Sequence, residues 1–141
     1  MNKKDESDWQ MMADKLCHEP NAIRQILLAC DPVVDLYPAS IHRNGPAIFC
    51  LARIGSVKRL VVVAPTHFFD QAAERSDDAA AARIVAQLAG ETRTVGTVLV
   101  KCCPLTVANS LLLRQAFPFT SPVSLADRAV TIGLGDRLGL A

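Results

Sequence analysis

Residues 40–65 read SIHRNGPAIFCLARIGSVKRLVVVAP, and this stretch decides the fold. Asn44-Gly45 is typical of a tight hairpin turn, and it separates SIHR from AIFCLAR, so the sequence predicts two neighbouring strands. Pro46 weakens the start of the second strand, because proline has no N–H to donate to the ladder. A further turn in IGSVK leads into RLVVVAP, a third strand. Its unbroken apolar run indicates that both of its faces are covered.

Two helices are predicted before this meander. Ser7 and Gln10 have the spacing of a capping box, which would begin a short helix that runs through Leu16. Pro20 suits the first turn of a second helix, which reaches about Cys30. Apolar residues recur along this second helix at helical spacing, and the Asp-Pro pair that follows it ends it.

Helices and strands are expected to alternate after the meander. Ser76 is the predicted N-cap of a helix over DDAAAARIVAQLAG, which Gly90 ends. VGTVLVKC, from Val95, reads as a fourth strand, and LTVANSLLLRQAF reads as a helix capped by Thr106. RAVTIG, at 128–133, is the predicted fifth strand. The pattern indicates the α/β class, with one mixed sheet and helices packed on it.

Composition narrows the function classes. The chain has 141 residues, 50% of them hydrophobic and 21% charged, with a formal net charge of +1. These values are typical of a globular domain, and no basic stripe indicates a nucleic-acid partner. The most apolar run is far shorter than a membrane span. The charged start MNKKDESD has no apolar run behind it, so we expect no signal peptide, no membrane association and a cytoplasmic location.

The cysteines and histidines show no arrangement typical of a metal or catalytic site. The five cysteines include no CxxC pair, so buried, reduced thiols are favoured over disulfides or zinc; they are Cys17, Cys30, Cys50, Cys102 and Cys103. Neighbours 102 and 103 should point to opposite faces of a strand. The three histidines are scattered without HxH or HExxH spacing, so no metal site is predicted in this chain; they are His18, His42 and His67.

The last residues, TIGLGDRLGLA, hold three of the seven glycines. Their spacing misses the dinucleotide fingerprint by one residue, so nucleotide binding is not favoured. A strand that runs into such a loop is also typical of a barrel mouth, where ligands bind. There Asp136 could hold a hydroxyl group and Arg137 could grip a carboxylate with two hydrogen bonds, beside Gly135. The alternative is an Asp-Arg pair that merely stabilises a turn.

This C-terminal segment resembles the tagaturonate epimerase family, whose members interconvert tagaturonate and fructuronate in hexuronate catabolism. The resemblance rests on Phe117-Pro118, on Pro122-Val123 and on the Gly-x-Gly-Asp-Arg-Leu-Gly block at 133–139, over about 25 residues. In the family this loop begins a barrel-like catalytic part, followed by a Thr-Pro-His continuation. The resemblance implies that Gly135, Asp136 and Arg137 bind the sugar acid and that the complete enzyme uses a divalent metal.

The change in sequence character at about Tyr37 and the resemblance together indicate three segments. Residues 1–36 form N-terminal helices, 37–127 an α/β N-terminal domain, and 128–141 the start of a truncated, barrel-like catalytic domain. We therefore expect an N-terminal fragment of a metal-dependent sugar-acid epimerase, inactive alone, with its catalytic residues and its oligomeric state unassigned. The alternative is a free-standing α/β module that binds a partner chain or a small ligand without catalysis.

Overall fold

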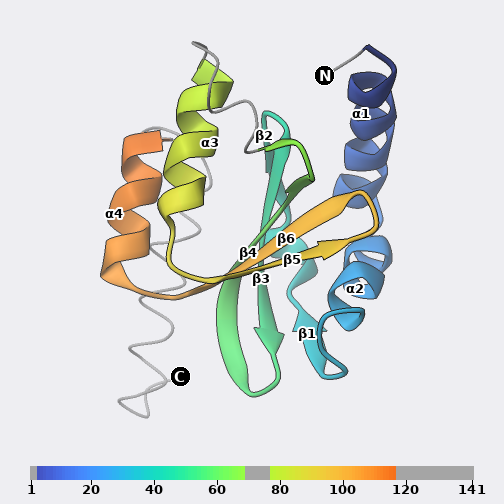
Figure 1. Ribbon diagram of the computed structural model, residues 1–141. Helices are drawn as coiled ribbons and strands as arrows, with labels where there is room; N and C mark the ends of the chain where they lie inside the picture. The colour runs from blue at the N-terminus through green and yellow to red at the C-terminus, as the bar shows by residue number, and fades with distance from the viewer. Residues whose placement is uncertain (1–2, 69–76, 117–141) are drawn as a thin grey trace.

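The computed structural model describes residues 3–68 and 77–116, and these residues form three layers (Figure 1). One antiparallel sheet lies in the middle. Helices α1 (Lys3–His18) and α2 (Pro20–Leu28) cover one face, and α3 (Asp77–Gln87) and α4 (Val107–Ala116) cover the other. The predicted α/β class, a sheet with helices packed on it, is confirmed.

Within the described residues the sheet has six strands, with the central order β1-β3-β4-β6-β5. The strands are β1 (Val34–Leu36), β2 (His42–Asn44), β3 (Ala47–Ile54), β4 (Val57–Pro65), β5 (Glu91–Val95) and β6 (Val98–Pro104). Strand β3 pairs with β4 on one side and with both β1 and β2 on the other. The predicted meander of β2, β3 and β4 is confirmed, including the turn at Gly45, whose φ is 57°.

A short 3-10 turn, η1 (Pro38–Ser40), fills the gap between β1 and β2 along β3. The Ser40 hydroxyl accepts a hydrogen bond from the Leu51 N–H at 2.8 Å, and the Tyr37 N–H donates to the Leu51 carbonyl at 3.1 Å. The backbone of β3 is therefore satisfied where neither short strand reaches it.

Successive side chains of the central strands point to opposite faces of the sheet, so the interior is divided into two cores. Phe49, Leu60 and Val62 face α3 and α4, whereas Ile48, Val61 and Val63 face α1 and α2. All six are at most 1% exposed. The unbroken apolar run of β4 is thus explained as predicted, because each of its two faces needs its own apolar set.

The first N-terminal helix, α1, begins earlier than predicted. Helix α1 begins at Lys3, so Ser7 lies inside the helix and the capping box expected from Ser7 and Gln10 is wrong. The physical reason is that the buried face at Trp9 and Leu16, rather than a local cap, sets this helix. Helix α2 begins at Pro20, as predicted, and ends at Leu28.

The strand predicted from Val95 begins three residues later, as β6 at Val98, and an unpredicted strand, β5, precedes it in a hairpin. Strands β5 and β6 pair from Glu91↔Cys102 to Val95↔Val98, and residues 96–97 form the turn. Gly96 takes a φ of 62°, which suits a tight turn. The strand at β1 was also not predicted, because three residues carry too little periodicity to detect.

Helix α4 is anchored at its start by two polar side chains. The Thr106 hydroxyl accepts from the Asn109 N–H at 3.1 Å, which confirms the predicted cap. The Asn109 side chain accepts from the Ala89 N–H at 2.9 Å and donates to the carbonyls of Ala89 and Pro104 at 3.2 and 2.8 Å. It therefore joins α4, β6 and the loop after α3.

Two predicted features lie outside the described residues. These are the cap at Ser76 and the fifth strand at 128–133. Among the helices that are described, none is both long enough and apolar enough to cross a membrane.

Candidate functional site

The site residues predicted from the sequence, Gly135, Asp136 and Arg137, lie outside the described residues. The described chain ends with α4 at Ala116, and 117–141 contains the whole glycine loop. The functional groups that the structure does place are therefore those of the three-layer fold.

The three histidines do not converge. His18 is exposed and its Nδ1 lies 2.7 Å from the Asp14 carbonyl of the same helix. His42 lies in β2, where partial burial lowers its pKa from the usual 6.5. His67 follows β4. Within 3–68 and 77–116, no group of three His, Cys, Asp or Glu side chains is arranged to hold a metal ion.

The cysteines are all free thiols. Burial raises the pKa of Cys50 and of Cys103 to about 12, and that of Cys102 to about 11. Cys102 packs against the core under α1 and α2 and Cys103 belongs to the core under α3 and α4, so the prediction of opposite faces is confirmed. Thiols held in their neutral form are poor nucleophiles, which supports a packing role.

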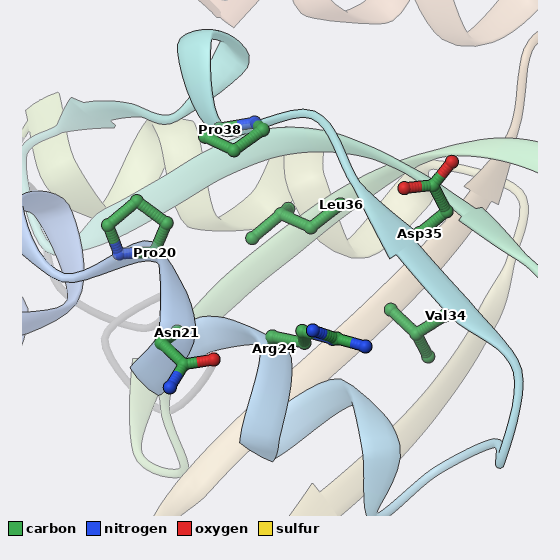
Figure 2. A pocket seen from close by; sticks show the side chains of 7 residues that line it. All are labelled: Pro20, Asn21, Arg24, Val34, Asp35, Leu36 and Pro38. Carbon is green, nitrogen blue, oxygen red and sulfur yellow. The ribbon is translucent and has the colours of Figure 1, made fainter.

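A groove opens between the start of α2 and strand β1 (Figure 2). Its volume is about 280 Å³, and it is lined by Pro20, Asn21, Arg24, Val34, Asp35, Leu36 and Pro38. Arg24 and Asp35 are both exposed, and the Asp35 carboxylate points away from Arg24 (Figure 2). Ordinary ligand pockets start at about 300 Å³, so this groove could hold at most a small molecule.

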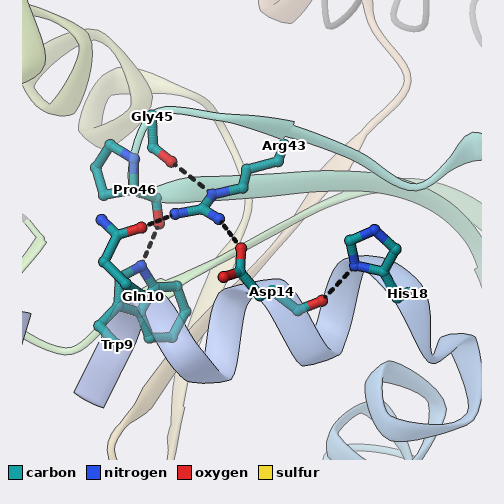
Figure 3. Close-up of polar contacts among 7 residues, drawn as sticks. All are labelled: Trp9, Gln10, Asp14, His18, Arg43, Gly45 and Pro46. Atoms are coloured by element: carbon teal, nitrogen blue, oxygen red, sulfur yellow. Dashed lines mark hydrogen bonds and ion pairs between the residues drawn. The ribbon is translucent and has the colours of Figure 1, made fainter. Parts of the chain in front are cut away.

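A second polar cluster joins α1 to the turn between β2 and β3 (Figure 3). The Arg43 guanidinium lies between Asp14 and Gln10. Its Nη1 donates to Asp14 Oδ1 at 2.5 Å, its Nη2 donates to Gln10 Oε1, and its Nε donates to the Gly45 carbonyl at 3.2 Å. Trp9 Nε1 donates to the Pro46 carbonyl at 2.9 Å. These bonds from Arg43 and Trp9 all join groups of the chain itself, so the geometry fits helix docking better than ligand binding.

The comparison with protein families decides the relationship. A family model described as tagaturonate epimerase matches residues 37–141. The chain belongs to the tagaturonate epimerase family. Neither the curated proteins nor the solved structures contain a significant match to it.

The groove lies almost wholly outside the family match. The tagaturonate epimerase match begins at Tyr37, so of the seven groove residues only Pro38 falls inside it. Arg24 and Asp35, which carry the charge, lie outside it. The groove is therefore a feature of the segment that precedes the epimerase-like region.

Sequence reasoning missed this groove and the cluster around Arg43. Neither has a local signature, because Arg43 meets Asp14 across 29 positions of sequence and the groove forms where α2 lies beside β1. The Asn-Gly turn was the one available signal, since it sets where Arg43 and Gly45 lie.

Proposed function

We propose that this chain forms part of an enzyme that interconverts tagaturonate and fructuronate in hexuronate catabolism. The match over 37–141 carries the proposal, because it includes both the β2–α4 region of the fold and the Gly-Asp-Arg-Leu-Gly block. In this proposal Arg137 binds the substrate carboxylate, Asp136 binds a hydroxyl group, and the glycines let the loop approach the sugar acid closely.

The reaction sets the requirements for such a site. The two ketoacids differ at a hydroxyl-bearing carbon that is not attached to the carbonyl carbon, so simple enolisation does not reach its proton. A retro-aldol cleavage and re-addition would solve this, and a proton-transfer or hydride route would be an alternative. The retro-aldol route needs a base for the hydroxyl proton and a cation that keeps the carboxylate end in place. Arg137 supplies that cation in the proposal.

A divalent metal is expected in the complete enzyme, but the described residues do not fit one. Cys50, Cys102 and Cys103 keep their protons at neutral pH, and no three suitable side chains meet in the described ranges. We derive no step of the reaction through a metal held by these residues. The proposal instead gives 3–116 a scaffold role and holds that the 141-residue chain alone is inactive, in a cytoplasmic pathway.

Binding and turnover by the 141-residue chain test this proposal separately. We expect NMR to show no conversion of tagaturonate to fructuronate, with or without Mg²⁺, Mn²⁺ or Zn²⁺, but saturation transfer from protein to tagaturonate. Arg137→Gln should weaken this binding at least about tenfold, whereas the matched control Arg53→Gln, near the end of β3, should not.

Each outcome has a distinct meaning. Conversion by the chain alone would refute the scaffold role, and equal binding by the Arg137→Gln protein would reject the role of Arg137. Failure to bind either uronate would reject substrate binding by this chain. It would favour the alternative, a non-catalytic interaction module.

A further inference from the structure

Strand β5 is an edge strand with an exposed backbone. It pairs with β6 on one side, and no other strand within the described residues pairs with it (Figure 1). Glu91, Thr92, Arg93 and Thr94 are all exposed. The strand has no proline and no bulge, because its register with β6 is continuous. Such an edge is a template for another strand.

The hairpin register shows which backbone groups of β5 are available. Val95↔Val98 closes the two-residue turn, so Val95, Arg93 and Glu91 direct their N–H and C=O groups toward β6. Thr92 and Thr94 direct theirs away from the sheet, because hydrogen bonding alternates along an antiparallel strand. A partner strand would therefore bond to these two threonines.

The charges of β5 are complementary to themselves in one register. If two copies pair antiparallel about Thr92, Thr92 exchanges both backbone hydrogen bonds with its counterpart. Glu91 of each copy then lies opposite Arg93 of the other, in a non-hydrogen-bonded pair where side chains are closest. Pairing about Arg93 would instead place two arginines opposite each other, which is unfavourable.

The side chains are already held near the positions that this pairing needs. Glu91 and Arg93 are two residues apart in the strand and therefore lie on the same face of the sheet, and Arg93 Nη2 lies 3.9 Å from Glu91 Oε2. Arg93 Nη1 donates to the Cys30 carbonyl at 3.0 Å, which restrains the guanidinium beside the edge. The Arg93 side chain is 57% exposed and the Glu91 side chain 80% exposed, so both can accept a further partner.

We propose that β5 is a homodimerisation edge, at which a second copy of this chain adds its own β5 antiparallel about Thr92 and continues the sheet across a two-fold axis. The interface is isologous, since each copy contributes the same strand. A contact of one short strand is small, so we expect a weak dimer with a dissociation constant on the order of 100 µM.

Charge reversal gives a test in which loss and rescue are both predicted. Sedimentation equilibrium from about 10 µM to about 1 mM should show a monomer–dimer equilibrium for the wild-type chain. Arg93→Glu places glutamates opposite each other twice and should weaken the dimer at least about tenfold. The double variant Glu91→Arg/Arg93→Glu should restore dimerisation, because the opposite-charge pairs are formed again with their positions exchanged.

Two further variants separate this edge from other causes. Thr92→Pro removes an outward N–H that the ladder with β6 does not use, so it should abolish the dimer while the circular dichroism spectrum stays unchanged. Arg24→Glu, an exposed charge reversal on α2, is the matched control and should leave dimerisation unchanged.

Hydrogen exchange identifies the occupant of the edge. The Thr92 and Thr94 amides should become protected as protein concentration rises. Protection that is independent of concentration would show that the chain covers its own edge, for example with residues 128–133, and would overturn the proposal. A chain that stays monomeric at about 1 mM, or a dimer that Arg93→Glu and Thr92→Pro leave intact, would overturn it equally.

Discussion

Lys101 and Asn109 hold the layer of α3 and α4 through buried polar contacts. Lys101 is only 4% exposed, and its Nζ donates to the carbonyls of Val85 and Ala86 at 3.1 and 3.0 Å, near the end of α3. Burial lowers the pKa of Lys101, but the positive charge lies at the negative end of the α3 dipole, where it is favoured. Neither side chain could be recognised as structural from the sequence, since their partners are backbone groups of other elements.

The buried cysteines should make the free energy of unfolding fall as the pH becomes alkaline. The folded state raises the pKa of Cys50 and of Cys103 from 9.0 to about 12, so these neutral thiols contribute stability that is complete below pH 9. As pH rises from 9 toward 12 the unfolded chain releases these protons first, and that stability is lost. We expect the urea midpoint to fall over this range. The Cys50→Ala/Cys103→Ala protein, less stable throughout, should show a smaller fall between pH 9 and 11.

A thiol titration supplies the matching control. At pH 8 in the folded protein, the two buried thiols should not react with a disulfide reagent, and in urea all five should react. Fast reaction of Cys50 or Cys103 in the folded state would contradict the burial on which this prediction depends.

At the scale of elements, the β5–β6 hairpin shows how two glycines can have different roles. Gly96 has a φ of 62° with open space around it, and it allows the turn. Gly90 has a φ of 153°, and a Cβ there would lie 2.3 Å from the Cys102 carbonyl oxygen. The sequence predicted that Gly90 ends a helix, but α3 already ends at Gln87. What Gly90 provides is the close approach of the loop to β6.

Alanine substitutions should separate these roles. Gly96→Ala carries only the backbone strain of a left-handed residue, about 1–2 kcal/mol of unfolding free energy. Gly90→Ala also forces a Cβ into backbone atoms that cannot rotate away, so it should cost at least about 3 kcal/mol. Chemical denaturation of both variants measures the difference. Equal losses for the two variants would show that the close contact at Gly90 relaxes freely.

At the scale of the whole molecule, the sheet couples the two helical layers. Ile48 and Phe49 are neighbours in β3, yet they belong to different cores, and the same holds for Val61 and Val62 in β4. Loss of one core would expose half of each central strand. The helices at the N-terminus therefore support the sheet of the epimerase-like region even though the family match begins at Tyr37.

A destabilising substitution in α2 should therefore also unfold the layer of α3 and α4 on the other face of the sheet. Leu27 is fully buried under the sheet, so Leu27→Asp buries an unpaired charge and should abolish the cooperative thermal transition. Gln25→Asp, on the exposed side of the same helix, is the control and should change stability by less than about 1 kcal/mol. Hydrogen exchange in α4 gives the decisive readout. If Leu27→Asp leaves the α4 amides protected, the two layers fold independently.

The sequence by itself determined the elements with strong local signals and the family. The Asn-Gly turn, the apolar run of β4, Pro20 and Thr106 act through neighbours in the chain, and the Gly-Asp-Arg-Leu-Gly block carried the resemblance that the family match confirms. Whether Asp136 and Arg137 bind substrate stays a prediction, since they lie outside the described residues.

Only the tertiary structure decided how these elements meet. It moved the start of the strand predicted from Val95 to Val98, added β1 and β5, placed Ser7 inside α1, and brought Arg43 to Asp14 and β5 to the edge of the sheet. Each of these features depends on contacts between residues far apart in the chain. Local propensity contains no information about such contacts, and they are fixed only when both faces of the sheet are buried at once.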